Sequence, residues 1–124
     1  MLVICAIIVK QGKILATQRS EKMHLPLKWE FPGGKVKEKE TEIDCIVREI
    51  KEELGFIIQP IKRLQPVTHK YGHEITLVPF ISEYIGGEII LTEHKAFSWL
   101  AKEELLTLDW AAADINVVHQ YLNL

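Results

Sequence analysis

The chain has 124 residues, a length that suits one domain with one hydrophobic core. Hydrophobic residues make up 48% of the chain and charged residues 26%, as in an ordinary soluble globular protein, and the formal net charge is −2. This balance argues against strong binding to a nucleic acid polymer or to an anionic membrane, so a small anionic partner would need local help from a metal ion or an arginine.

The first apolar run, from Leu2 to Val9, is short and has no basic leader, so it predicts a strand rather than a signal peptide. No apolar run in the chain reaches the ~20 residues that a membrane-spanning helix needs. Cys5 and Cys45 are too few for a disulfide framework and are expected to be buried thiols. Together these features predict a cytoplasmic protein.

The N-terminal third of the chain is predicted to form short strands and loops. The segments in order are a strand at 2–9, a strand at 13–18, a polar loop at 19–28 and a short strand-like piece at 29–31. Gly12 marks the turn of a hairpin between the first two strands. Pro32, Gly33 and Gly34 end the strand-like piece, and no regular element is expected to continue through these three residues.

The clearest helix is predicted from Thr41 to Leu54. Thr41 with Asp44 resembles a capping pair, although Glu or Gln is the usual partner, and Gly55 supplies the C-terminal stop. An apolar stripe at helical spacing supports the assignment. Its members are Ile43, Ile46, Val47, Ile50 and Leu54.

The rest of the chain alternates between strands and turns before a second helix closes it. The expected elements are extended segments at 56–61 and 64–69, strands at 74–84, 89–91 and 96–100, a helical turn at 102–105 and a helix at 111–122. Pro79 lies inside the expected strand at 74–84 and indicates that this strand is at an edge of the sheet or contains a bulge. The order of elements predicts an α/β fold with a mixed β-sheet and helices on both faces.

Three carboxylates share one side of the predicted helix. At ~100° per residue, Glu49, Glu52 and Glu53 fall within one arc, apart from the apolar stripe. Clustered carboxylates repel one another, and a hard divalent cation such as Mg²⁺ or Mn²⁺ would remove that cost. The Gly33-Gly34 turn lets backbone atoms approach the same point. A solvated, glutamate-rich helix face is the alternative explanation.

A fixed spacing links the glycine turn to this helix. Gly34 is followed by five residues, then Glu40, then seven residues, then the run Arg48-Glu49-Ile50-Lys51-Glu52-Glu53-Leu54-Gly55-Phe56. At every defined position this pattern resembles the signature of the Nudix hydrolases, and the order of elements over residues 1–124 fits the family's α/β/α sandwich. The resemblance implies metal-dependent hydrolysis of a nucleoside diphosphate linked to another group.

The resemblance also implies roles for the residues of the signature. Glu49, Glu52 and Glu53 would bind Mg²⁺, with Mn²⁺ as a possible substitute, or orient metal-bound water, and the carbonyl of Gly33 would be a further ligand. The metal would neutralise phosphate oxygens and lower the pKa of the attacking water.

Two further roles follow from the same resemblance. Arg48 would form an ion pair with Glu40 and orient the catalytic carboxylates. One carboxylate must act as general base, and Glu49, Glu53 and Glu93 are all candidates.

The run from Trp29 to Val36 resembles the MutT branch of the family, whose members cleave nucleoside triphosphates to monophosphate and pyrophosphate. Glu93 lies where that branch often carries another metal-site carboxylate, and Arg19 where it has a substrate-contacting arginine. An exposed loop acid and a solvated arginine are the alternative interpretations.

The choice of base depends on weaker signals. In MutT-like enzymes a polar residue entering the last helix touches the base, and Asp114 occupies that place here. An asparagine, used to select oxidised guanine, both donates and accepts hydrogen bonds, whereas an ionised aspartate only accepts and suits an exocyclic amino group such as that of cytosine. A protonated aspartate would blur this distinction, and a helix N-cap is the alternative role for Asp114.

Three other residues complete the expected substrate site. Gly34 would lie against the substrate, and Phe31 and Tyr71 are candidates for stacking on a base. A place in the hydrophobic core is the alternative for both aromatic residues. The five histidines show no metal-ligand spacing and receive no role; His24, His69, His73 and His94 are expected at the surface or in loops.

The sequence therefore predicts a house-cleaning or cytidine-type nucleoside triphosphate pyrophosphohydrolase, acting on an oxidised guanine nucleotide such as 8-oxo-dGTP or on CTP or dCTP. Hydrolysis of ADP-ribose or a dinucleoside polyphosphate is one alternative, and an inactive nucleotide-binding module is another. The expected partner is a small nucleotide, with no nucleic acid polymer and no membrane. Both a monomer and a homodimer remain open.

Overall fold

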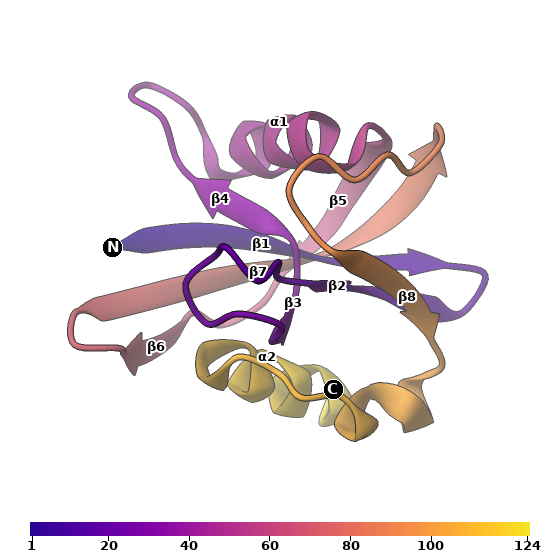
Figure 1. Cartoon of the computed structure of the whole chain (residues 1–124). Helices are drawn as coiled ribbons and strands as arrows, with labels where there is room; N and C mark the ends of the chain where they lie inside the picture. Colours follow the sequence, from indigo (N-terminus) through magenta and orange to yellow (C-terminus); the bar gives the residue numbers. More distant parts are fainter.

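The computed structural model describes residues 1–124 and has a mixed β-sheet between two helical layers (Figure 1). The strands are β1 (Leu2–Lys10), β2 (Lys13–Gln18), β3 (Trp29–Glu30), β4 (Gly33–Lys35), β5 (Ile57–Arg63), β6 (Val67–Lys70), β7 (Glu74–Gly86) and β8 (Ala96–Leu100). The main path of the sheet runs β3-β2-β1-β7-β5, while β4 pairs with β1, β6 with β7 and β8 with β2. β1 and β7 are parallel, and the other pairs are antiparallel.

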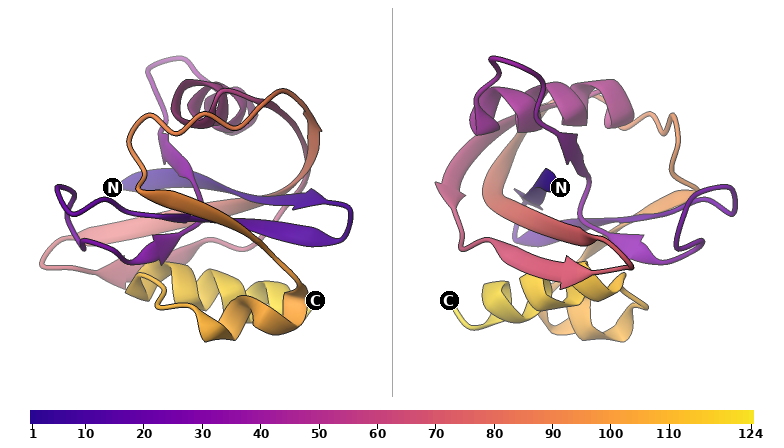
Figure 2. Two further views of the ribbon diagram at one scale, coloured as in Figure 1. Left: turned by 45° about the vertical axis from the view of Figure 1, so that its right-hand side comes forward. Right: turned by 90° about the vertical axis from the view of Figure 1, so that its left-hand side faces the viewer.

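The helices cover opposite faces of this sheet. Both views in Figure 2 show α1 (Glu42–Leu54) on one side, with α2 (Ala112–Leu122) and the 3₁₀ helix η1 (Lys102–Thr107) on the other. This arrangement confirms the predicted α/β/α sandwich. None of the helices is both long and apolar enough to span a membrane.

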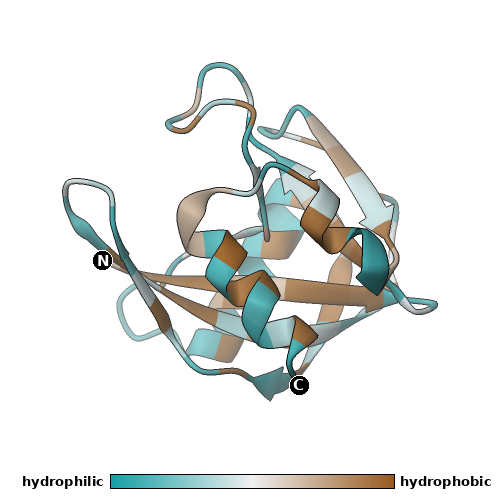
Figure 3. Ribbon diagram, turned by 90° about the horizontal axis from the view of Figure 1, so that it is seen from below, coloured by the Kyte–Doolittle hydropathy of each residue, from teal (hydrophilic) through white to brown (hydrophobic).

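β1 runs through the middle of the sheet and is buried on both faces. Cys5 and Ile7 belong to the core cluster under α2, whereas Ile4, Ala6 and Ile8 belong to the cluster under α1. Successive side chains of a strand point to opposite faces, so one unbroken apolar run supplies both cores. Figure 3, which looks onto α2, shows hydrophobic residues along the strands behind that helix.

α1 begins and ends as its sequence predicts. Thr41 Oγ1 accepts a hydrogen bond of 3.0 Å from the backbone N–H of Asp44, and Gly55 adopts a left-handed conformation with φ of +80°. The buried side of α1 contains Cys45, Ile46, Ile50 and Leu54. Ile43, the first member of the predicted stripe, is half exposed. The caps and the apolar face fix which side of α1 remains available for the carboxylates.

Two local predictions are wrong. Regular structure does continue past Pro32, because Gly33 and Gly34 form β4 and pair with Cys5 and Ile4 of β1. The predicted strand at 89–91 is absent, and that segment belongs to a loop bound to the end of α1, where Ile90 N–H donates to the Leu54 carbonyl. In both places the partner that decides the structure is distant in the sequence.

Pro79 lies in an interior strand rather than at an edge. β7 pairs with β1 on one side and with β6 and β5 in turn on the other. Pro79 falls between the two partners, where its carbonyl accepts a 2.8 Å hydrogen bond from Leu64 N–H. The N–H that proline lacks would face the same gap, so no ladder bond is lost.

Candidate active site

The packing of β4 against α1 brings a glycine and a glutamate together. A Cβ atom on Gly34 would collide with the carboxylate of Glu49, and a Cβ atom on Gly33 would collide with the backbone of Ile4 and Cys5. Both positions therefore need glycine for a reason that the turn alone does not provide. The consequence is that the Glu49 carboxylate lies directly against the backbone of β4.

Arg48 ties α1 to the segment that precedes it. Its Nε and Nη2 atoms donate to the two oxygens of Glu40 over 2.6 and 2.9 Å, which confirms the ion pair expected between these residues. Nη2 also donates to the Lys35 carbonyl on β4, over 3.2 Å. The guanidinium lowers the pKa of Glu40 to about 2.

The same guanidinium contacts two of the predicted metal ligands. Arg48 Nη1 donates to Glu49 over 2.9 Å and to Glu52 over 3.1 Å. The side chain of Glu52 is 55% exposed, whereas those of Glu49 and Glu53 are 16% and 14% exposed. The three carboxylates therefore divide into a shielded pair and one that extends toward solvent.

The shielded pair is under electrostatic strain. Burial raises the pKa of Glu53 well above its ordinary value, and the hydrogen bond and charge of Glu49 raise it further, followed by the charges of Glu30 and Glu93. In the present arrangement no three or more His, Cys, Asp or Glu side chains converge into a metal-binding cluster. The structure brings together Glu49 and Glu53 and leaves Glu52 outside that pair.

The loop before β8 adds a further carboxylate. Thr92 donates from its N–H and its hydroxyl to the Glu53 carbonyl, over 3.3 and 3.0 Å. The next residue, Glu93, then lines a cavity of about 190 Å³ together with Glu53 and Gly33. The predicted metal-site residues Gly33, Glu53 and Glu93 therefore border one space.

A larger cavity of about 440 Å³ adjoins the first, because Arg19, Glu30 and Asp114 line both. Gly34 and Tyr71 also line it. The predicted substrate residues from the start of the chain, the β6–β7 turn and α2 thus meet around one hollow. The two adjoining cavities together extend from Tyr71 and Asp114 to Glu53.

Asp114 lies in the first turn of α2, but it does not cap that helix. The N-cap residue is Ala111, so the alternative role predicted for Asp114 is wrong. Asp114 is buried, and its Oδ1 atom accepts a 2.9 Å hydrogen bond from Phe31 N–H. Burial raises the pKa of its carboxyl well above the ordinary value, and the charge of Glu30 adds to this effect.

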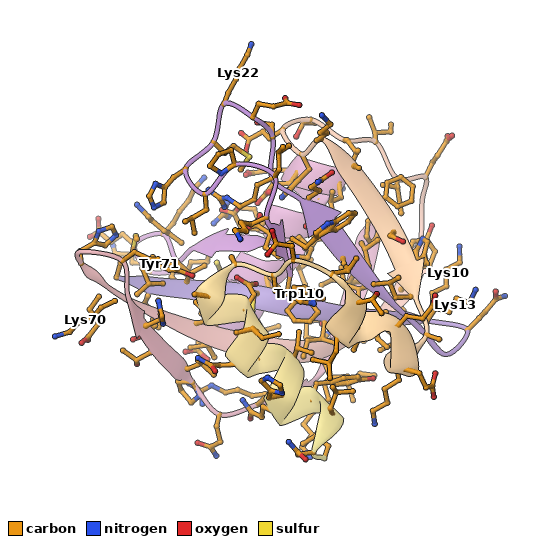
Figure 4. All side chains as sticks on the ribbon, turned by 60° about the horizontal axis from the view of Figure 1, so that its bottom comes forward. Lys10, Lys13, Lys22, Lys70, Tyr71 and Trp110 are labelled. Carbon is orange, nitrogen blue, oxygen red and sulfur yellow. The ribbon has the colours of Figure 1, made fainter.

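The two aromatic candidates have different positions. The Phe31 ring is 3% exposed and packs on Trp110 at 4.7 Å between centroids, so it belongs to the core, while its backbone N–H donates to Asp114. Tyr71 is partly exposed at the β6–β7 turn, and its hydroxyl accepts a 2.6 Å hydrogen bond from Ala113 N–H. Figure 4 shows Tyr71 at that turn and Trp110 close to the start of α2.

Glu30 and His94 are site residues that the sequence did not reveal. Arg19 Nη1 donates to Glu30 Oε1 over 2.7 Å, and His94 Nε2 lies 2.8 Å from Glu30 Oε2. His94 lies in a loop, one of the two positions expected for it, but its side chain is fully buried rather than at the surface. The only local signal for His94 was its position beside Glu93.

The chain is similar to known proteins over nearly its whole length. The family model described as "NUDIX domain" matches residues 2–121. The chain is 34% identical to the "CTP pyrophosphohydrolase" of Escherichia coli, over 98% of this chain and 91% of that protein. It is also 34% identical to the "Putative 8-oxo-dGTP diphosphatase 2" of Mycobacterium tuberculosis, over 91% of this chain and 82% of that protein.

A solved structure agrees over nearly the whole length. The solution structure of the E. coli ORF135 protein superposes with a TM-score of 0.87 at 32% identity, covering 98% of this chain and 88% of that one. Because the family model and these relatives span almost every residue, the chain belongs to the Nudix family.

Proposed function

We propose that this protein is a divalent-metal-dependent hydrolase that cleaves nucleoside triphosphates to nucleoside monophosphate and pyrophosphate. The observation that carries this proposal is the shielded Glu49–Glu53 pair beside a cavity that continues toward Asp114 and Tyr71. Two relatives of this chain, a CTP pyrophosphohydrolase and a putative 8-oxo-dGTP diphosphatase, have names that describe this class of reaction.

The residues of the pair fit a divalent metal. Burial and the neighbouring Glu49 raise the pKa of Glu53, and such a shielded pair favours a hard cation, because its charge would offset the repulsion between the carboxylates. Glu49, Glu53 and Glu93 would hold Mg²⁺ or Mn²⁺ together with Glu52 and the Gly33 carbonyl. When bound, the metal would neutralise phosphate oxygens and lower the pKa of the attacking water.

The protein's own residues would perform the remaining tasks. One of the clustered carboxylates would accept the proton of the attacking water. Arg48 holds Glu49 through a 2.9 Å hydrogen bond and so orients the carboxylate that faces β4. Arg19, at the junction of both cavities, supports the proposal of a cation that contacts the substrate.

Two classes of base suit the groups around the larger cavity. An ionised Asp114 would accept a hydrogen bond from an amino group such as that of cytosine, whereas a protonated Asp114 would also donate and could pair with an oxidised guanine. Burial raises the pKa of this carboxyl and so favours its protonated form. Tyr71, which lines the larger cavity, would stack on either base.

A pyrophosphate-release screen tests the proposal. Purified protein with Mg²⁺ would be assayed on CTP, dCTP, dGTP, 8-oxo-dGTP, ADP-ribose and a dinucleoside tetraphosphate, with the products separated by chromatography. We expect equimolar monophosphate and pyrophosphate from a cytidine or oxidised guanine triphosphate, and none with excess EDTA. Cleavage of ADP-ribose or the dinucleotide alone, or metal-independent turnover, would contradict the proposal.

A further inference from the structure

His94 is a buried histidine that lies between the carboxylates of Glu30 and Glu53. Its Nε2 atom is 2.8 Å from Glu30 Oε2, and its Nδ1 atom is 3.7 Å from Glu53 Oε2. The side chain is fully buried, and Nδ1 has no hydrogen-bond partner. Buried polar atoms are nearly always paired, so an unpaired one at this position calls for an explanation beyond packing.

The backbone on both sides of His94 is fixed. Thr92 is bound to the Glu53 carbonyl at the end of α1, and Lys95 N–H donates to the Gln18 carbonyl of β2 over 2.9 Å. The ring therefore projects from a short segment that is hydrogen-bonded to α1 on one side and to β2 on the other. A histidine held in this way can fix the position of the groups it touches, because it has little freedom of its own.

Glu30 extends the connection toward the nucleotide cavity. One of its oxygens faces His94, and the other accepts the 2.7 Å hydrogen bond from Arg19. Arg19, Glu30, His94 and Glu53 thus form a continuous row whose side chains are 19%, 16%, 0% and 14% exposed. The row runs from the wall of the larger cavity to the carboxylate pair.

We propose that His94 is a positioning residue with two separable tasks. Its Nε2 atom fixes the carboxylate of Glu30 at the larger cavity, and its Nδ1 atom restrains the carboxylate of Glu53 at the proposed metal site. The second task rests on the proposed metal role of Glu53. Each carboxylate would otherwise sample several rotamers, and substrate or metal binding would have to order it. Groups that orient metal ligands typically change metal affinity by about 10–100-fold when they are removed.

Three substitutions separate the two tasks. Counted in bonds from the backbone, a glutamine amide reaches the position of Nε2, and an asparagine amide reaches that of Nδ1. His94→Gln should therefore keep Glu30 in place and lose the contact with Glu53, whereas His94→Asn should do the reverse. His94→Leu should lose both, and His119→Leu, a change at an exposed position of α2, is the control.

Two measurements report on the two tasks. Mn²⁺ binding without nucleotide, followed by electron paramagnetic resonance, should weaken about tenfold or more in His94→Gln and His94→Leu and stay near wild type in His94→Asn. The KM for the best nucleotide at saturating Mg²⁺ should rise in His94→Asn and His94→Leu and stay near wild type in His94→Gln. Thermal melting establishes that each variant is folded.

The outcomes decide between positioning and packing. Wild-type Mn²⁺ affinity and KM in folded glutamine and asparagine variants would overturn the proposal, as would a lower active fraction with both constants unchanged. If His94→Leu does not fold, the other two variants still carry the test. Glu53→Gln belongs in the same Mn²⁺ titration: if it also binds like wild type, the metal role of Glu53 fails, whereas weakening in Glu53→Gln alone refutes only the role of His94.

Discussion

The carboxylate of Glu49 occupies the space that a side chain on Gly34 would need, so a Cβ atom at position 34 would collide with both carboxylate oxygens. The contact joins α1 to β4, and it involves the far end of a flexible glutamate rather than backbone. A substitution at Gly34 therefore acts on the position of Glu49 more than on the fold.

Gly34→Ala should lower kcat/KM by roughly 100-fold while the melting temperature changes little, since displacing a catalytic group by about 1 Å has an effect of that size. Gly86→Ala is a matched control, because nothing lies within 4 Å of its Cβ position. Gly33→Ala, which would collide with the backbone of β1, should instead lower the free energy of unfolding by about 2 kcal/mol or more. Full activity in Gly34→Ala would show that the position of the Glu49 carboxylate does not matter for the reaction.

Glu52→Gln and Glu53→Gln should each reduce kcat by orders of magnitude, because each removes a charge from the proposed metal site. Both variants should fold, and Glu53→Gln should be at least as stable as wild type, since it removes a buried charge and the repulsion by Glu49, which together raise the pKa of Glu53. Steady-state kinetics and thermal melting would measure the two effects. The exposed Glu103→Gln serves as the control, and near-wild-type activity in both test variants would rule out their metal role.

Asp114→Asn should shift the substrate ranking toward oxidised guanine by about tenfold in relative kcat/KM. The asparagine oxygen can still accept the Phe31 N–H, but its amide nitrogen is a fixed donor and cannot accept a bond from an amino group as an ionised carboxylate can. Competition assays with a cytidine and an oxidised guanine triphosphate would measure the ratio. An unchanged ranking would remove Asp114 from the base pocket.

The same variant should change how stability depends on pH. The unfolded Asp114 carboxyl ionises near 3.8, whereas the buried one holds its proton to a higher pH, so wild-type stability falls as pH rises above about 3.8. Asp114→Asn avoids this loss and should melt at a higher temperature at neutral pH, with a difference that vanishes below about pH 3.8. Asp109→Asn, at an exposed position, is the control. A constant difference across this range would contradict the burial argument.

Glu40 has the opposite pH dependence. Because Arg48 lowers its pKa to about 2 from the usual 4.5, the ion pair stabilises the fold fully above about pH 4.5 and ceases to do so as pH falls through about 2. Glu40→Gln should be less stable than wild type at pH 6, and its denaturant midpoint should change less on acidification to pH 2. If the denaturant midpoint falls equally in both proteins on acidification, the Arg48–Glu40 ion pair contributes little to stability.

The sequence predicted the fold class, the hairpin, α1 with both caps, and the Arg48–Glu40 ion pair. These features follow from local periodicity or from a signature with fixed spacing. The sequence did not predict β4, because two consecutive glycines usually indicate a turn. Only their pairing with β1 makes them part of a strand. The predicted strand at 89–91 was wrong for the related reason that its backbone binds α1 instead of a strand.

The sequence by itself determined the family, the helix that carries Glu49, Glu52 and Glu53, and the chemical character of the site. Only the tertiary structure decided which of those carboxylates are shielded together, how deeply Asp114 lies, and that His94 joins Glu30 to Glu53. The physical reason is chain separation: Glu30 and His94 are 64 residues apart, and Phe31 and Asp114 are 83 apart. Periodicity describes neighbours along a helix or strand, whereas burial and pKa depend on which distant segments pack against each other.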